Sequence, residues 1–399
     1  MSATTVMIDH RLDLSSVADK TLRAATTSWF VVTVLGQLAF GFAVATFYGL
    51  TSLRGDYHKW NFTNGFVPGI SMGNTAVVMH LVSAVIIMLA GAVQLVPQVR
   101  AKFPAFHRWN GRIYLFSAVA LSAAGVYMHL VRGSVGGPVI HIAGTVNAIL
   151  IWICAGYALR YAMERDFRHH RRWALRLFLV VSASWFLRIG IFLSFLIARG
   201  ALGFDPTSLQ GPFFTFMAFA CYLFPLGVLE IYLWAQGRPG GLRRMATAVM
   251  LFVLTLGMAA GLLGVGAAIW APQVKAGFDR RTSIAETLSS TIASSGIDAA
   301  EKQYRELAAA RPANYNFDEG ELNSLGYQLL RAKKFEAAIR ILQLNIEAYP
   351  KSSNVYDSLG EAYMDDGNKP LAIANYEKSL QLNPKNANGR SMLARLKAH

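Results

Sequence analysis

The histidines of this sequence are the residues best suited to carry chemistry, because neutral imidazole is an axial ligand of haem iron and a common ligand of other metals. His80 and His141 lie towards one end of two long apolar segments, and His107 and His170 lie in the loops just before two others, on the opposite side. One pair at each side of a helix bundle, on alternate helices, is the arrangement expected of a transmembrane cytochrome with two b-type haems. The spacing therefore predicts haem b as a cofactor.

Other interpretations of the same histidines stay open. In one of them, haem binds only at His80 and His141, the pair expected on the outer side. His80, His129 and His141 would also give a zinc or copper site with three imidazoles and one open position. In a third interpretation no cofactor is bound, and the histidines sit at the membrane interface beside Arg and Trp side chains that act as headgroup anchors.

Arg188 lies well inside an apolar segment, where inserting a guanidinium into a membrane costs about 2.5–3.5 kcal/mol. It should therefore face the interior of the bundle and have a partner. A haem propionate or a bound anion is one expected partner, and backbone carbonyls or a water-lined crevice are the other.

The elements that must position these residues are apolar segments long enough to cross the roughly 30 Å of membrane hydrocarbon. Seven such segments can be identified, so we expect a seven-helix transmembrane bundle. They cover residues 29–50, 75–96, 111–131, 138–160, 173–198, 212–235 and 247–271.

Basic residues indicate how the bundle is oriented. Six arginines lie in the segment 160–176, and short loops rich in Lys and Arg stay in the cytoplasm. With seven spans, the N-terminus is then cytoplasmic and the C-terminal domain extracytoplasmic. Up to Phe278 the chain has 22 Lys+Arg and 8 Asp+Glu, and after it 16 and 15. The positive charge therefore belongs to loops that face anionic lipid, and nucleic acid is not an expected partner.

The C-terminal part repeats with a period of 34 residues. Gly326, Ala338 and Pro350 recur as Gly360, Ala372 and Pro384, in the pattern of tetratricopeptide repeats. Such repeats stack helix pairs into an α-solenoid that binds a peptide or protein partner. We therefore expect an all-α chain with a cytoplasmic segment 1–28, a membrane domain 29–272, a linker 273–296 of uncertain order, and a tetratricopeptide domain 297–399.

Two resemblances add to this interpretation. The block from His80 to Arg188, which includes Gln94, Pro97, the segment 107–114 and the segment 170–176, resembles an uncharacterised family of bacterial predicted multi-spanning membrane proteins. That resemblance implies a bacterial plasma-membrane protein and adds no reaction. The histidine layout, in turn, is similar to that of the cytochrome b561 type.

The tail resembles the tetratricopeptide tails of bacterial exported hydrolases, but the chain has no Ser-x-x-Lys motif and no soluble domain to hold one. The leading hypothesis is thus a haem-binding electron-transfer protein with an external protein-binding module. A non-catalytic anchor, scaffold or sensor and a transporter are the alternatives.

Overall fold

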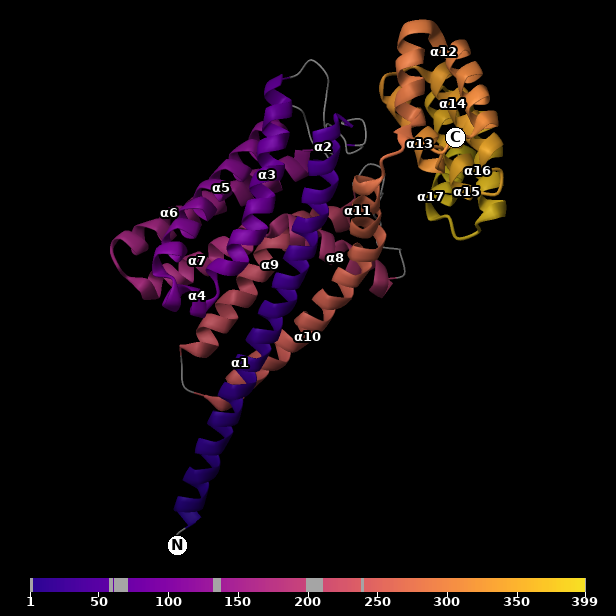
Figure 1. The fold of residues 1–399 in the computed structure, drawn as a ribbon. Coiled ribbons are helices and arrows are strands. Elements are labelled where there is room, and N and C mark those ends of the chain that lie inside the picture. The colour runs from indigo at the N-terminus through magenta and orange to yellow at the C-terminus, as the bar shows by residue number, and fades with distance from the viewer. Residues whose placement is uncertain are drawn as a thin grey trace. The chain divides into compact units, whose positions relative to one another are not determined.

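The computed structural model describes residues 3–56, 60, 71–131, 138–198, 211–237 and 240–398. Nearly all of this chain is helical (Figure 1), which confirms the expected all-α class. The chain divides into two compact units, Met1–Phe278 and Asp279–His399.

The first unit contains the apolar helices. They are α1 (Ala3–Val44), α2 (Leu50–Arg54), α3 (Ser71–Gln94), α4 (Pro97–Lys102), α5 (Pro104–Val131), α6 (Pro138–Met163), α7 (Phe167–Val181), α8 (Ala183–Ala198), α9 (Pro212–Gln236), α10 (Gly241–Val265) and α11 (Ala271–Phe278). Single π-helical turns at 45–49 and 266–270 join α1 to α2 and α10 to α11.

Within the described ranges, six helices are long and apolar enough to cross a membrane, and a seventh span results if α7 and α8 count as one. A multi-spanning membrane domain is thereby supported. The expected fifth span, 173–198, is not straight, because α7 and α8 meet at a bend of 56°. The bend lies at Ser182, whose hydroxyl donates to the Phe178 carbonyl (2.7 Å) and accepts a hydrogen bond from the buried Gln37 amide of α1 (2.9 Å).

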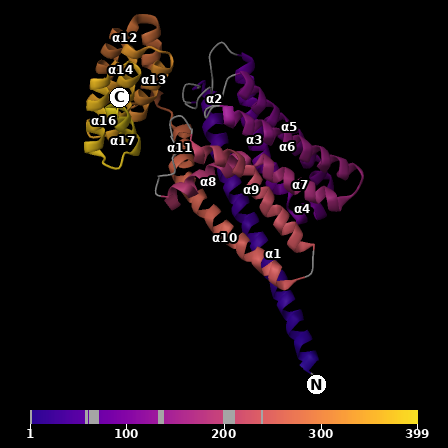
Figure 2. The same cartoon turned by 180° about the vertical axis from the view of Figure 1, so that it is seen from behind.

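Helices far apart in sequence pack closely in this unit. Helices α1 and α10 lie side by side (Figures 1 and 2). At Gly36 on α1, an added Cβ would come within 2.7 Å of Leu262 and Trp185. At Gly261 on α10, it would come within 2.7 Å of the Ile189 carbonyl oxygen on α8. Small residues therefore set the spacing between these helices, as is common in membrane bundles.

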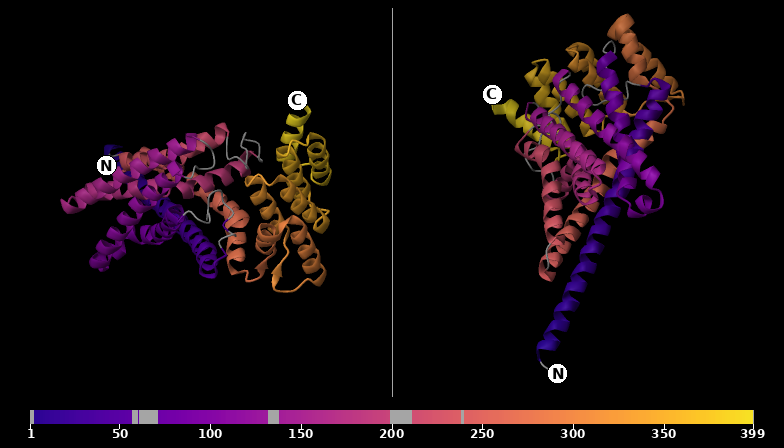
Figure 3. Two further views of the ribbon diagram at one scale, coloured as in Figure 1. Left: turned by 90° about the horizontal axis from the view of Figure 1, so that it is seen from above. Right: turned by 90° about the vertical axis from the view of Figure 1, so that its left-hand side faces the viewer.

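The second unit consists of helices and one short strand pair, and Figure 3 shows it from two further directions. Parallel strands β1 (Thr282–Ser283) and β2 (Tyr315–Asn316) pair with each other. The helices are α12 (Ile284–Ala310), α13 (Glu319–Arg331), α14 (Phe335–Ala348), α15 (Ser353–Asp365), α16 (Lys369–Leu382) and α17 (Ala387–Ala398).

The segment 273–296, expected to be a linker, is largely helical in this structure. It contains the end of α11, strand β1 and the first half of α12. Ile284 and Leu288 are fully buried in the core of the second unit, and the boundary between units falls at Phe278. The single helix α1 likewise begins far before the expected span start at residue 29.

The 34-residue repeat is also a repeat of structure. At Gly326, where α13 meets α14, an added Cβ would lie 2.6 Å from Leu342. At Gly360, where α15 meets α16, it would lie 3.2 Å from Tyr376. The two helix pairs thus make their closest approach at corresponding positions.

Candidate functional site

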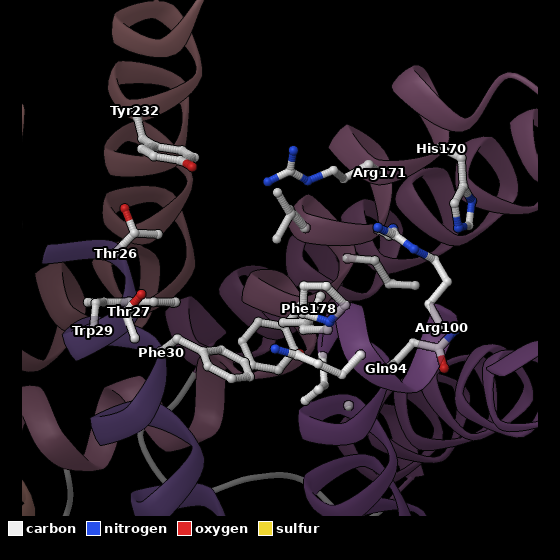
Figure 4. A pocket seen from close by; sticks show the side chains of 18 of the residues that line it. Thr26, Thr27, Trp29, Phe30, Gln94, Arg100, His170, Arg171, Phe178 and Tyr232 are labelled. Atoms are coloured by element: carbon white, nitrogen blue, oxygen red, sulfur yellow. The ribbon is translucent and has the colours of Figure 1, made fainter. Parts of the chain in front are cut away.

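A cavity of about 940 Å³ opens among the helices of the first unit (Figure 4). Its walls come from the C-terminal ends of α3, α6 and α9, from α4, from the N-terminal halves of α5, α7 and α10, and from the part of α1 around residues 19–31. These ends carry the basic loops, so the cavity lies at the side of the bundle expected to face the cytoplasm. Both inner histidines, His107 and His170, line it.

His170 is held by backbone contacts on both sides. It lies in the first turn of α7, which begins after the N-cap residue Asp166, and the His170 N–H donates to the Asp166 carbonyl (2.9 Å). Its Nδ1 is 2.8 Å from the Ala158 carbonyl oxygen of α6. A carbonyl only accepts, so Nδ1 must be the protonated nitrogen, and in the neutral ring Nε2 keeps its lone pair. Metal-ligating histidines are commonly oriented by a bond of this kind.

His107 lies in the first turn of α5 and faces Gln94 of α3. The Gln94 amide donates to the His107 carbonyl (3.2 Å) and lies 3.4 Å from His107 Nε2, and Asn110 donates to Gln94 Oε1 (2.8 Å). The other ring nitrogen, Nδ1, is buried, and no hydrogen-bond partner for it is found in the described chain. His107 and His170 line the same cavity.

Two glycines allow the side chains at this wall to approach closely. An added Cβ at Gly111 would lie 2.7 Å from Gln94 Nε2, and one at Gly91 would lie 2.9 Å from Tyr114 Cε2. All of Gln94, His107, Gly111 and Tyr114 belong to the block singled out from the sequence. The structure therefore gathers these residues around one cavity.

The cavity lining is rich in positive charge. Four arginines and one carboxylate line it, and the carboxylate, Asp19, forms an ion pair with Arg244. No carboxylate in the described ranges pairs with the other three arginines, which are Arg23, Arg100 and Arg171. The lining also includes apolar side chains, among them Trp29, Phe30, Leu175, Leu177 and Phe178.

His169, the neighbour of His170, points elsewhere. Its imidazole pairs with the Asp166 carboxylate (2.6 Å), it stacks on Tyr161, and it does not line the cavity. The His169 N–H and imidazole both donate to Asp166 and hold the pKa of that carboxyl below its ordinary value. The two adjacent histidines therefore have different surroundings.

The outer histidines form a second group. His80 of α3 donates from Nδ1 to the Leu121 carbonyl of α5 (3.2 Å), which leaves Nε2 with a lone pair in the neutral ring. The ring of His129 of α5 lies tilted against the ring of His141 of α6, with ring centroids 5.3 Å apart. His129 thus lies next to His141, one member of the pair proposed from the sequence, and its Nδ1 is buried without a partner among the described residues.

Within the described ranges, no group of three or more His, Cys, Asp or Glu side chains is arranged to hold a metal ion. The zinc or copper interpretation of His80, His129 and His141 stays a prediction.

Arg188 of α8 lies close to this outer group and acts electrostatically on His80. It donates to the Ser184 carbonyl (2.8 Å) and the Ser184 hydroxyl, and its guanidinium lies 5.1 Å from the centre of the Phe40 ring. These contacts match the backbone-carbonyl alternative stated for Arg188. They leave part of the guanidinium available to a further partner.

The contribution of α1 to the cavity was not foreseen from the sequence. Asp19, Arg23 and Thr27 recur every four residues and all line the cavity, together with Thr26 and Trp29. A polar row with helical spacing just before an apolar span was the available signal, because such a row places its side chains on one face of the helix.

Comparison with known proteins is informative for the middle of the chain only. Residues 77–224 match the model of a family described as predicted membrane protein (DUF2306). No curated protein and no solved structure matches the chain. The matched segment extends from α3 into α9 and contains both histidine pairs, so the part of the chain that holds them is similar to that family of predicted membrane proteins.

Proposed function

We propose that the first unit is a transmembrane b-type cytochrome that carries electrons between the two sides of the membrane. The observation that carries this proposal is that His107 and His170, from different helices, line one cavity and that His170 Nε2 is left with a free lone pair. In this proposal His107 and His170 hold the inner haem, and His80 and His141 hold an outer one.

The lining residues fit haem in three respects. Imidazoles are the usual axial ligands of b-type haem, and the bond from His170 to the Ala158 carbonyl fixes the orientation of that ring. Arg100 lines the cavity together with His107 and has no carboxylate partner in the described chain, so it can pair with a propionate. Phe178, Leu175 and Tyr114 offer an apolar wall, and the cavity volume lies within the range of cofactor sites.

A bound haem supplies a one-electron carrier, and the protein sets its potential through ligands, hydrogen bonds and burial. Ala158 and Leu121 supply the backbone carbonyls that orient His170 and His80. Gln94 holds the first turn of α5 against α3 and so positions His107. Arg188 lies beside the outer pair, where a propionate would neutralise its charge.

The experiment compares two neighbouring histidines in detergent-purified protein. In His170→Ala we expect the oxidised-minus-reduced visible spectrum to lose the contribution of the inner haem. His169→Ala is the matched control, because His169 does not line the cavity, and it should keep the wild-type spectrum. Equal spectra for both variants would remove His170 as a ligand. His80→Ala and His141→Ala should remove the outer haem in the same way.

For the second unit we propose a tetratricopeptide module that binds a peptide or protein partner outside the cytoplasm. The repeated close approaches at Gly326 and Gly360 support it. The first helices of successive pairs are linked side by side by polar contacts, Tyr327 to Glu361 (2.8 Å) and Asp357 to Asn388 (2.9 Å). Such a row forms one continuous face, as in solenoids that bind extended partners.

This face can be tested in cells by cross-linking of the full-length chain. Asp365 is exposed and lies one turn after Glu361 on α15, so Asp365→Lys reverses a charge on the proposed binding face. We expect it to change the set of cross-linked partners. Lys378→Glu on the exposed side of α16 is the control and should leave the set unchanged. Identical partners in wild type and Asp365→Lys would contradict the assignment of this face.

A further inference from the structure

The haem proposal does not use the end of the cavity formed by α1, α9 and α10. Arg23, Thr26 and Thr27 come from α1, and Tyr232 comes from α9. Figure 4 shows the Arg171 side chain extended from the histidine side of the cavity towards Tyr232 and Thr26. This end is therefore lined by two guanidiniums, Arg23 and Arg171, and by several hydroxyl groups.

These two arginines lack the partners that such groups normally have. Asp19 is the one carboxylate among the lining residues, and it is already paired with Arg244. No other carboxylate in the described part of the chain pairs with Arg23 or Arg171. Both residues are solvent-exposed, and the planar donors of a guanidinium match phosphate oxygens in a bidentate manner.

The surroundings favour an anion that also has an apolar part. Trp29 and Phe30 follow Arg23 and Thr27 along α1 and line the same cavity, so charged and apolar side chains meet within three turns of one helix. Basic pockets between membrane helices on the cytoplasmic side are typical sites for anionic lipid headgroups. A phosphate diester attached to acyl chains has both properties.

We propose that this end of the cavity binds the phosphate of an anionic phospholipid headgroup, held between Arg23 of α1 and Arg171 of α7. Tyr232 accepts a hydrogen bond from Gln236 (3.2 Å), which leaves its hydroxyl proton available to donate to a phosphate oxygen. The site is separate from the proposed haem ligands, because it uses neither imidazole. A bound lipid would also tie α1 to α7.

The test measures lipid binding to the detergent-purified full-length protein by native mass spectrometry. Phosphatidylglycerol is the probe, phosphatidylcholine is the zwitterionic comparison, and inorganic phosphate is added in a third arm. We expect wild-type protein to bind phosphatidylglycerol at least about tenfold more tightly than phosphatidylcholine. We expect Arg23→Gln/Arg171→Gln to lose most of that preference, since each guanidinium contributes a charge-assisted contact.

The control variant is Arg168→Gln/Arg172→Gln, which removes two charges from the same helix start without touching the cavity lining. This control variant should keep the wild-type preference for phosphatidylglycerol over phosphatidylcholine. Equal binding of phosphatidylglycerol by wild type and Arg23→Gln/Arg171→Gln would overturn the proposal. Displacement of the lipid by millimolar inorganic phosphate would overturn the lipid as ligand, because it would show a site for soluble phosphate.

Lipid binding and haem binding are separate readouts, so the lipid proposal can fail while the haem proposal holds, and the reverse. His170→Ala should keep the preference for phosphatidylglycerol even where it loses haem absorbance. Loss of lipid preference in His170→Ala, with retained preference in Arg23→Gln/Arg171→Gln, would also contradict the assignment to the two arginines.

Discussion

At the scale of single residues, the contrast between His169 and His170 shows how backbone contacts assign roles to neighbouring side chains. Asp166 caps α7 and bonds His169, while the Ala158 carbonyl turns His170 into the cavity. His169 and His170 are adjacent in the sequence, but the start of α7 gives their imidazoles different hydrogen-bond partners. The cap at Asp166 therefore orients the proposed ligand without touching the cavity.

A pH dependence follows from this cap. Hydrogen bonds from His169 lower the pKa of Asp166 in the folded state, below the unfolded value of about 3.9. A carboxyl group shifted in this direction stabilises the fold above the unfolded pKa, and the contribution is lost as pH falls through the folded pKa. In hydrogen exchange, the first-turn amides of α7 should lose protection as pH drops from 5 to about 3.

Asp166→Asn keeps a capping oxygen and removes the ionisable group. In this variant, the hydrogen-exchange protection of the first-turn amides of α7 should change little over the same pH range. An equal loss of protection in wild type and Asp166→Asn would mean that another group controls the start of α7.

Gly111 offers a second test at this scale. A methyl group there would displace the Gln94 amide, which lies 2.7 Å from the Cβ position, and so free the first turn of α5 around His107. Because the displaced group is the end of a flexible side chain, Gly111→Ala should fold with a thermal midpoint near wild type and yet shift the haem midpoint potential. Gly156→Ala on α6, where nothing lies within 4 Å, is the control and should shift neither. An unchanged potential in Gly111→Ala would exclude Gln94 as a positioning residue.

At the scale of elements, the contact between α8 and α10 depends on Gly261. An alanine Cβ would lie 2.7 Å from the Ile189 carbonyl oxygen, and a backbone atom cannot move aside as a side chain can. Gly261→Ala should destabilise the bundle by about 1–3 kcal/mol, measured as denaturant or thermal unfolding. Gly227→Ala on α9, where nothing lies within 4 Å of the added Cβ, should leave the stability of the bundle unchanged. Equal stability of the two variants would contradict close packing at this crossing.

The sequence predicted the apolar helices because these depend on local composition. The placement of His107 and His170 on the cytoplasmic side depends on loop charge and stays a prediction. The sequence did not predict the break at Ser182, since Val181 and Ala183 continue the apolar pattern and the break depends on Gln37 of a distant helix. The segment 273–296 resembled a linker because of its Ser and Thr residues. Yet Ile284, Leu288 and Ile292 recur every four residues and pack in the core. Which face α1 turns to the cavity depends on tertiary packing with α9 and α10.

At the scale of the whole molecule, the bent pair α7–α8 decides the topology. If the pair crosses the membrane as one span, the bundle has seven spans and the two termini lie on opposite sides. A reporter active only outside the cytoplasm, fused after His399, should then be active, while the same reporter at the N-terminus should be inactive. Equal behaviour of both fusions would mean that α7–α8 enters and leaves on one side.

The most direct test of the cytochrome proposal is made on the purified protein. An oxidised-minus-reduced visible spectrum, combined with haem extraction and protein quantification on the same haem-replete sample, gives the type and number of haems per chain. We predict a b-type spectrum with two haems per chain, one for His107 and His170 and one for His80 and His141. One haem per chain would restrict the proposal to a single pair, and a colourless protein from haem-replete cells would contradict it.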